Sequence, residues 1–314
     1  MNDTMVIQAR RIAGEFLLEQ VKSSYPIIGK GFVNQVCVVE TEGHKVVVRM
    51  NNKDNYPTFI KEKWCIEQAA AGIPGPYTWS VGVMDETAYM IQTFVEGDNG
   101  LDSKAAPSDI WRKLGEYAKQ IHSIQVTGFG EELIDPIQGT FRSPPHPGSD
   151  GSWRGYVHYN INSLTEHDPL LELGVIKKKE SGIVRQWFEQ LSNKKFRFGL
   201  CHGDISLKNT MVHPTGQLIL LDWGSAEVTV VPYGDVIHLM RCQLRGEGPD
   251  EEQLKAFSEG YGMSEEELDL ARHVLLLKAF DNLRWAMDKC PEQVNHYAGS
   301  AKQVFNMVRD ASRD

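Results

Sequence analysis

Cysteine is scarce in this sequence and lacks the spacing that builds a framework. The 314 residues include five cysteines, an odd number, and no two have C-x-x-C spacing. Disulfide scaffolds need paired thiols, and zinc knuckles need closely spaced ones. The sequence therefore argues against a disulfide framework and against a zinc knuckle.

Long apolar runs and an excess of positive charge are also absent. No apolar stretch approaches the roughly 18 residues of a membrane span. The first residues, MNDTMVIQAR, lack the apolar core of a signal peptide. The formal net charge is -9, which repels the phosphate backbone of nucleic acids. We therefore expect a cytoplasmic protein that binds neither membranes nor nucleic acid, and the sequence does not indicate an oligomeric state.

Motifs of three common enzyme classes are missing. Gly29 and Gly31 form a G-x-G pair, but no G-K-[ST] follows, so this is not a P-loop. The pair precedes a strand pattern, whereas a dinucleotide-binding fold would have a helix there. No G-x-S-x-G occurs, which disfavours a serine hydrolase.

The first third of the chain predicts a small, mainly antiparallel sheet with helices. Clusters of β-branched residues punctuated by glycine alternate with apolar residues at helical spacing. A turn at Glu42 and Gly43 would join two of the strands. The predicted elements are a helix over 5–22, a strand ending near Glu40, a strand over 45–50, a helix over 57–71, and strands near 77–84 and 88–95.

Beyond a candidate linker over 94–100, the pattern becomes helical. We expect helices over 107–124, 155–191 and 235–310. The segment 127–155 is rich in Gly, Pro and Ser, and long loops of this kind are either functional or disordered. The sequence thus predicts an α+β protein with an N-terminal lobe over 1–96 and a helical C-terminal lobe over 97–314.

The residues that carry chemistry surround a predicted hairpin. The chain reads His202-Gly203-Asp204, then Asn209, an apolar pair, a turn and a buried strand that ends at Asp222. Such a hairpin would bring Asn209 and Asp222 together at its open end, with Asp204 in the loop before it. Carboxylate and amide oxygens suit Mg²⁺, and a free carboxylate can take the proton of an attacking alcohol. The pattern therefore indicates phosphoryl transfer.

This H-G-D-x-x-x-x-N motif, followed by D-W-G-S-A, resembles the aminoglycoside phosphotransferase family, which is related to choline kinases and protein kinases. The resemblance implies a bilobed protein-kinase-like fold and phosphorylation of a small-molecule hydroxyl by ATP or GTP with Mg²⁺. By this likeness Asp204 is the catalytic base, and Asn209 and Asp222 bind the metal. His202 and Asp235 would support the catalytic loop.

The resemblance also implies a nucleotide site in the N-terminal lobe. Gly29, Gly31 and Asn34 match a variant of the family's phosphate-covering loop. The backbone of Thr93 and Val95 would contact the adenine.

A phosphate-binding cation is expected on the strand KVVVRM. Arg49 stands at the family position and can hold phosphate oxygens bidentately, with Lys45 as the alternative. Glu62 resembles the carboxylate that orients this cation, and Glu67 is its alternative. The competing interpretation of either glutamate is a solvated surface charge.

Two segments compete for the acceptor site. Acidic residues gather over 247–269, which would suit a polycationic aminoglycoside, although acidic residues also favour helix N-termini. Aromatic and basic residues gather over 141–159, which would suit an apolar acceptor or a cation held by ring faces.

Three functions stay open at this stage. The first is a kinase of an aminoglycoside or related antibiotic, which would confer antibiotic resistance. The second is a metabolic kinase of a choline-like amine, a sugar or another alcohol. The third is a pseudokinase that binds nucleotide without turnover, against which the complete set of base and metal residues argues.

Overall fold

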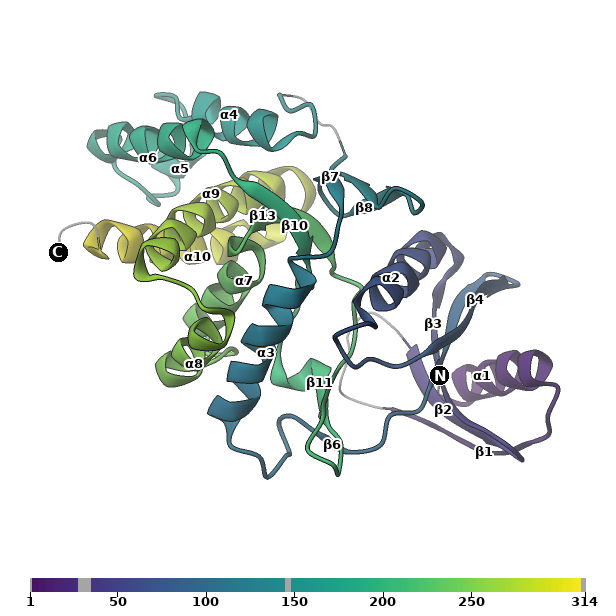
Figure 1. The fold of residues 1–314 in the computed structure, drawn as a ribbon. Helices are drawn as coiled ribbons and strands as arrows, with labels where there is room; N and C mark the ends of the chain where they lie inside the picture. Colours follow the sequence, from purple (N-terminus) through teal and green to yellow (C-terminus); the bar gives the residue numbers. More distant parts are fainter. Residues whose placement is uncertain (1, 28–34, 145–147, 312–314) are drawn as a thin grey trace. The chain divides into compact units, whose positions relative to one another are not determined.

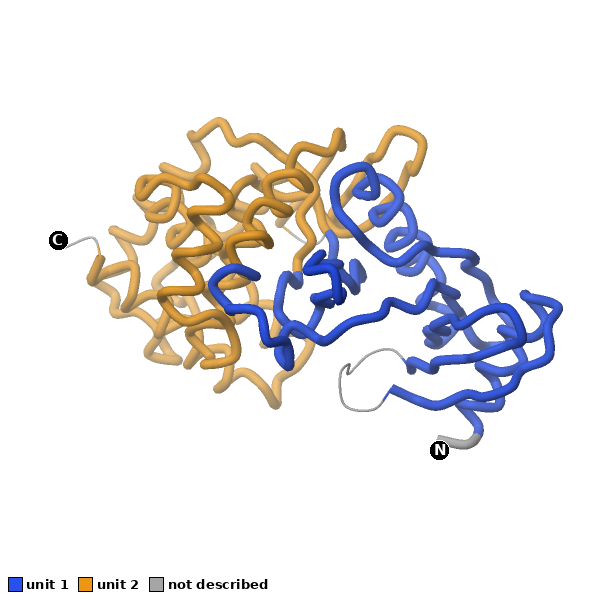
Figure 2. Tube along the Cα trace, turned by 60° about the horizontal axis from the view of Figure 1, so that its bottom comes forward, with its two compact units in different colours: residues 1–110, 204–226 blue, residues 111–203, 227–314 orange. Residues whose placement is uncertain are grey.

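The computed structural model describes residues 2–27, 35–144 and 148–311 (Figure 1). The chain divides into two compact units (Figure 2). Unit 1 comprises Met1–Ile110 and Asp204–Ala226, and unit 2 comprises Trp111–Gly203 and Glu227–Asp314. The segment around Asp204, Asn209 and Asp222 thus belongs to the same unit as the N-terminal sheet. The predicted lobe boundary after residue 96 stays a prediction.

Unit 1 is built on a five-stranded antiparallel sheet with the order β1-β2-β3-β5-β4. Short turns join β2 to β3 and β4 to β5, so hairpin pairing fixes these two pairs of neighbours. The prediction of a mainly antiparallel sheet is confirmed. The strands are β1 (Val21–Pro26), β2 (Gln35–Thr41), β3 (Lys45–Asn52), β4 (Thr78–Met84) and β5 (Thr87–Thr93).

The helices α1 (Asn2–Leu17) and α2 (Tyr56–Ala69) cover opposite faces of this sheet (Figure 1). Ile12 of α1 packs with Val48 of β3 in one buried cluster, whereas Phe59 of α2 packs with Met90 of β5 in another. Since neighbouring strand residues point to opposite faces, Arg49 projects toward α2. Because the side chains of β3 alternate between the two faces of the sheet, Arg49 can contact α2 but not α1.

The first predicted helix is too long. α1 ends at Leu17 and β1 begins at Val21, where 5–22 was expected to be helical. Leu18 has a φ of 54°, in the left-handed region that terminates a helix. The following residues pair with β2 as an edge strand, so sheet pairing overrides the helical pattern there.

The returning segment of unit 1 contains the predicted hairpin. The 3₁₀ turn η3 (Leu207–Asn209) leads into β11 (Thr210–Val212), which pairs with β12 (Leu218–Leu220). β11 also pairs with β6 (Asp98–Asn99) in the linker. The amide of Leu220 donates to the carbonyl of Pro74, which follows α2. These bonds attach the hairpin to the rest of unit 1.

Unit 2 is mainly helical, with the long helix α9 in contact with α4, α6, α7 and α10. An antiparallel pair, β10 (Arg197–Cys201) and β13 (Glu227–Val231), flanks the returning segment in sequence; no strand was predicted there. The helices are α3 (Pro107–Ile121, which begins in unit 1), α4 (Trp153–Ser163), α5 (Pro169–Glu172), α6 (Ser181–Asn193), α7 (Tyr233–Leu244), α8 (Glu251–Tyr261), α9 (Glu265–Lys289) and α10 (Val294–Ala311). Among the residues that the structure describes, no helix is both long and apolar enough to span a bilayer.

The described residues of the segment 127–155 contain regular structure. They include a three-stranded sheet of β7 (Thr127–Phe129), β9 (Thr140–Arg142) and β8 (Glu132–Asp135). Trp153 is 8% exposed, and its ring contacts Phe129, Tyr156 and Phe198. Trp153 and the buried Phe141 are therefore core residues of unit 2, which weakens their candidacy as an acceptor wall.

Candidate active site

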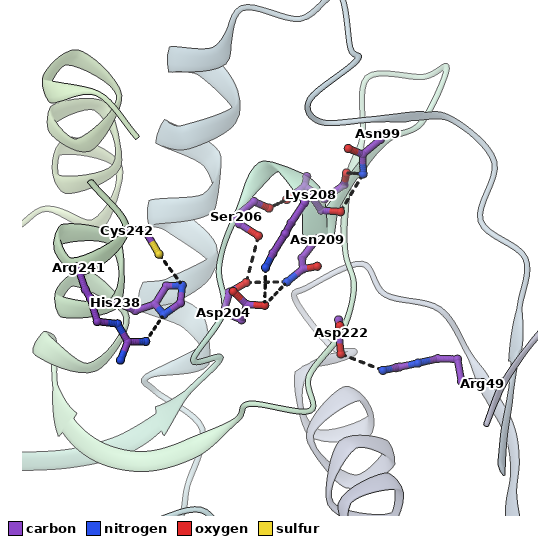
Figure 3. A network of polar contacts seen from close by, with 11 residues as sticks. Arg49, Asn99, Asp204, Ser206, Lys208, Asn209, Asp222, His238, Arg241 and Cys242 are labelled. Carbon is purple, nitrogen blue, oxygen red and sulfur yellow. Dashed lines mark hydrogen bonds and ion pairs between the residues drawn. The ribbon is translucent and has the colours of Figure 1, made fainter. Parts of the chain in front are cut away.

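A buried ion network connects the sheet of unit 1 with the D-W-G segment. Arg49 of β3 is paired with Glu62 of α2, and its other terminal nitrogen donates to Asp222 Oδ1 at 2.9 Å (Figure 3). The side chains of Arg49 and Glu62 are 8% and 1% exposed, whereas that of Asp222 is 46% exposed. One carboxylate therefore anchors the guanidinium inside the unit, and the other lies at its surface.

The two alternatives for this pair have other partners. Lys45 is exposed, and its ammonium lies 3.9 Å from the ring centre of Phe94. Glu67 pairs with the neighbouring Lys63 on the surface of α2. The structure thus brings Arg49 together with Glu62, the first choice of the sequence analysis.

Burial shapes the electrostatics of this network. Burial alone would lower the pKa of Arg49, but Glu62 and Asp222 together raise it above its ordinary value. Burial raises the pKa of Glu62, against the opposing charge of Arg49. Glu62 Oε2 is buried and has no hydrogen-bond partner among the described residues. The guanidinium of Arg49 therefore stays protonated and is the permanent positive charge of the network.

Helix α2 also holds the backbone of the D-W-G segment. The amide of Trp223 donates to Glu62 Oε1 at 3.1 Å, and Lys61 Nζ donates to the carbonyl of Ala226 at 2.8 Å. Lys61 is 7% exposed, an unusual burial for lysine. Sequence reasoning missed Lys61, since nothing in KEKW distinguishes it from its solvated neighbour Lys63.

The hairpin places Leu221, the residue before Asp222, beside Asn209. The predicted approach of Asp222 itself to Asn209 stays a prediction. The amide of Leu221 donates to the carbonyl of Asn209 at 2.8 Å. Asp222 follows with a φ of 58°, a left-handed conformation that Asp tolerates better than most residues and that often marks functional sites. The turn in the chain therefore occurs at the residue whose carboxylate meets Arg49.

Asp204 and Asn209 are in direct contact within unit 1. Asn209 Nδ2 donates to Asp204 Oδ2 at 2.8 Å and to the Asp204 carbonyl at 2.9 Å (Figure 3). Lys208 Nζ lies 3.2 Å from Asp204 Oδ2, and Asn99 Nδ2 donates to the Lys208 carbonyl at 2.8 Å. Lys208 and Asn99 were missed; the only signal was the position of Lys208 four residues after Asp204.

The donor set that remains suits a hard cation. Because its nitrogen is turned toward Asp204, the Asn209 side chain presents Oδ1 elsewhere. Asp222 uses Oδ1 for Arg49 and keeps Oδ2. Neither oxygen has a recorded partner within the described part of the chain. Amide and carboxylate oxygens are the ligands that Mg²⁺ prefers, so these residues fit a magnesium site.

Part of the predicted nucleotide site lies outside the described residues. This applies to Gly29, Gly31 and Asn34. Thr93 ends β5, where its hydroxyl accepts from the Tyr77 amide at 3.0 Å. Val95 follows β5 and is half-buried, and its predicted backbone contact with the adenine stays a prediction.

The loop-support residues lie together in unit 2. Asp235 of α7 is 1% exposed, and it accepts the amides of Gly203 at 2.8 Å and His202 at 3.2 Å. His122 Nε2 lies 3.0 Å from the same carboxylate, and its Nδ1 lies 2.9 Å from Tyr261 Oη. Asp235 thus has the contacts that a role in fixing the backbone before Asp204 requires.

A positive φ explains the glycine of the H-G-D motif. Gly203 has a φ of 80°, which residues other than glycine rarely adopt. Glycine therefore stands between His202 and Asp204 for a conformational reason.

The acidic segment 247–269 is used mainly at helix N-termini. Asp250 caps α8 by accepting from the Gln253 amide, and Ser264 forms a capping box with Glu267 at the start of α9. Carboxylates there stabilise the helix ends. Helix capping therefore explains why acidic residues gather in this segment, and no role in binding an acceptor is needed to explain them.

The sequence matches the model of the phosphotransferase enzyme family over residues 24–273. No curated protein matches it. Among solved structures, aminoglycoside phosphotransferase APH(4)-Ia has a TM-score of 0.65 and 18% identity, covering 96% of this chain and 98% of that one. Spectinomycin phosphotransferase APH(9)-Ia, solved with ADP and spectinomycin, has a TM-score of 0.57 and 15% identity, covering 95% and 97%.

A third similar structure is described as a fructosamine-3-kinase from Haemophilus somnus. Its TM-score is 0.60 at 13% identity, with 98% of this chain and 99% of that chain covered. At these identities the likeness concerns the fold. The predicted protein-kinase-like α+β fold, with an antiparallel-sheet region followed by a helical region, is confirmed.

The buried Asp235 cluster predicts a pH dependence of stability. Burial alone would raise the pKa of Asp235, but hydrogen bonds and charge from His122, His202 and Gly203 lower it below its ordinary value. A carboxylate with a depressed folded-state pKa stabilises the fold above its unfolded pKa of about 4. That stabilisation is lost as the pH falls below this value.

We therefore expect Asp235→Asn to flatten the fall in unfolding free energy between about pH 6 and pH 3. Urea denaturation at several pH values measures this slope for both proteins. The variant should also be less stable at neutral pH, because the amide accepts fewer bonds from the loop. Parallel pH profiles for wild type and variant would contradict the assignment.

Proposed function

This chain belongs to the phosphotransferase enzyme family and is a kinase, and on that premise we propose that it transfers the terminal phosphoryl group of ATP to a hydroxyl of a small molecule. The observation that supports this most directly is the contact between Asp204 and Asn209 beside the Arg49–Asp222 ion pair. The complete set of base and metal residues argues against the alternative of a pseudokinase that binds nucleotide without turnover.

Asp204 acts as the general base in this proposal. Its carboxylate is 22% exposed and is held from one side by Asn209 Nδ2. A positioned carboxylate can accept the hydroxyl proton as the alcohol attacks phosphorus. Lys208, paired with the same carboxylate, is placed to balance negative charge that develops on the transferred group.

Arg49, Asn209 and Asp222 bind the triphosphate and its metal. Mg²⁺, when bound, would neutralise charge on the phosphates; Asn209 Oδ1 and Asp222 Oδ2 are the oxygens that would hold it. Arg49 donates to phosphate oxygens while Glu62 fixes its orientation. ATP is the proposed donor, and GTP is its alternative.

The remaining nucleotide contacts come from the backbone. Thr93 and Val95 would bind the adenine, and Gly29, Gly31 and Asn34 would cover the phosphates. His202 and Asp235 position the catalytic loop and take no part in proton transfer. The five cysteines are unpaired, which supports the proposed location in the cytoplasm, where thiols stay reduced.

The acceptor separates the two kinase hypotheses. APH(9)-Ia is a spectinomycin phosphotransferase, which supports an antibiotic acceptor and a role in resistance. The alternative is a metabolic alcohol, and the fructosamine-3-kinase likeness supports that class equally. The helix-capping role of the acidic segment removes one argument for a polycationic acceptor.

Asp204→Asn should lower kcat by about a hundredfold or more while nucleotide affinity stays unchanged, because the amide cannot accept the proton. Nucleotide consumption with an acceptor panel measures the first quantity, and an ATP titration measures the second. Asp54→Asn, an exposed carboxylate elsewhere in unit 1, is the matched control. Full activity of Asp204→Asn would refute the base assignment.

Asp222→Asn should weaken ATP binding about tenfold or more in the presence of Mg²⁺. Without Mg²⁺ the two proteins should bind ATP similarly, since the amide oxygen still accepts from Arg49. Calorimetric titrations with and without the metal separate these effects. An equal loss of affinity under both conditions would assign Asp222 to Arg49 alone.

A further inference from the structure

Unit 2 contains a pocket between helices α7, α9 and α10. Its volume is about 110 Å³. Ile237, Leu275 and Val304 give it an apolar part, and Tyr297 and Ser300 add hydroxyl groups. We call it the α7–α9–α10 pocket. An apolar wall with a few polar groups is typical of small-molecule sites.

The charges of this pocket are opposite to that of the chain. Three cationic side chains line it, from Arg241, Arg245 and Lys278, against one carboxylate, Glu227. Lys278 Nζ lies 2.7 Å from Glu227 Oε1, so these two charges compensate each other. Arg241 and Arg245 remain as net positive charge in a chain of net charge -9.

Arg241 has donor capacity that the protein does not use. One terminal nitrogen donates to His238 Nδ1 at 3.2 Å (Figure 3). Its Nε is buried without a hydrogen-bond partner among the described residues, and no carboxylate of those residues forms an ion pair with Arg241 or Arg245. Arg241 lines the pocket, and its terminal nitrogens have donors left for oxygen atoms of a ligand.

The pocket adjoins the catalytic loop through the chain. Gly203 lines the pocket, and one peptide bond separates it from Asp204. Asp235 fixes the Gly203 amide. A ligand in this pocket therefore contacts the residue next to the proposed base.

We propose, building on the proposed function, that the acceptor is a small alcohol bearing a carboxylate or a phosphate, and that Arg241 and Arg245 bind this anionic group. The guanidinium fork matches the oxygens of either anion. Tyr297 and Ser300 offer hydrogen bonds to the other hydroxyls. A polycationic aminoglycoside would meet like charge here, which selects against it.

Four three-carbon alcohols that differ mainly in charge test this proposal: glycerate, glycerol phosphate, glycerol and serinol. Their affinities are measured by titration into protein saturated with Mg²⁺ and a non-hydrolysable ATP analogue, so that the phosphate site of the nucleotide is filled. We expect glycerate, glycerol phosphate or both to bind about tenfold or more tightly than glycerol. The cationic serinol should bind most weakly, and the two anions distinguish a carboxylate site from a phosphate site.

Arg241→Gln and the more exposed Arg245→Gln should each reduce the preference for the anion about tenfold. Arg241 is partly buried, so its substitution can also destabilise the fold. Arg245 is exposed, so its substitution tests binding without that effect. Lys302→Gln on the exposed side of α10 changes the total charge equally and should retain the preference. Equal affinities for the four probes, or an anion preference that survives in both arginine variants, would overturn the proposal.

A result that refutes the proposed kinase function differs from a result that refutes the anionic acceptor. In that case the anion preference and its loss in the arginine variants would stand, but no acceptor would stimulate Asp204-dependent consumption of ATP. If instead a neutral or cationic acceptor supports turnover that is insensitive to both arginine substitutions, the kinase function stands and the anionic acceptor is wrong.

Discussion

The structure of unit 1 depends on a buried guanidinium shared between two carboxylates. Removing the charge of Arg49 from water is costly, and a single missing partner would leave an uncompensated charge in the interior. Glu62 meets this requirement from α2, and Asp222 meets it from the segment after β12. Strand β3 and helix α2, which are neighbours in sequence, are thereby held to a segment 173 residues after Arg49. In the proposed function, this arrangement turns Arg49 and Asp222 toward the phosphates and the metal of one nucleotide.

Each unit fixes one end of the catalytic segment by the same physical means. In unit 1, Glu62 accepts the amide of Trp223; in unit 2, Asp235 accepts the amides of His202 and Gly203. Buried carboxylates form strong bonds to backbone amides, and each contact sits next to a residue proposed to act in the reaction. The backbone before Asp204 and after Asp222 is therefore preorganised. Catalysis of phosphoryl transfer depends mainly on such positioning of the reacting groups.

The sequence predicted those features that depend on local pattern. Strands β2 to β5 and the hairpin follow from alternation and turn residues, and the pairing of Arg49 with Glu62 follows from the family resemblance. Lys61 and Lys208 were missed because a buried or paired lysine has the same local signal as a solvated one. Trp153 was misread because its neighbours, Phe129 and Phe198, lie in separate segments. Arg241 and Arg245 of the pocket lie four residues apart, but Glu227 and Lys278 come from β13 and α9, so no local pattern could reveal how these charges group.

In the proposed reaction, Asn209 and Asp222 hold the metal of the nucleotide beside Asp204. Anomalous scattering from crystals grown with ADP and Mn²⁺, a substitute for Mg²⁺, locates that metal directly. We expect a manganese peak within about 2.5 Å of Asn209 Oδ1 and of an Asp222 oxygen, with the Asp204 carboxylate near but not bound to it. A nucleotide-associated peak coordinated by neither Asn209 nor Asp222 would refute the assignment of these two residues as metal ligands.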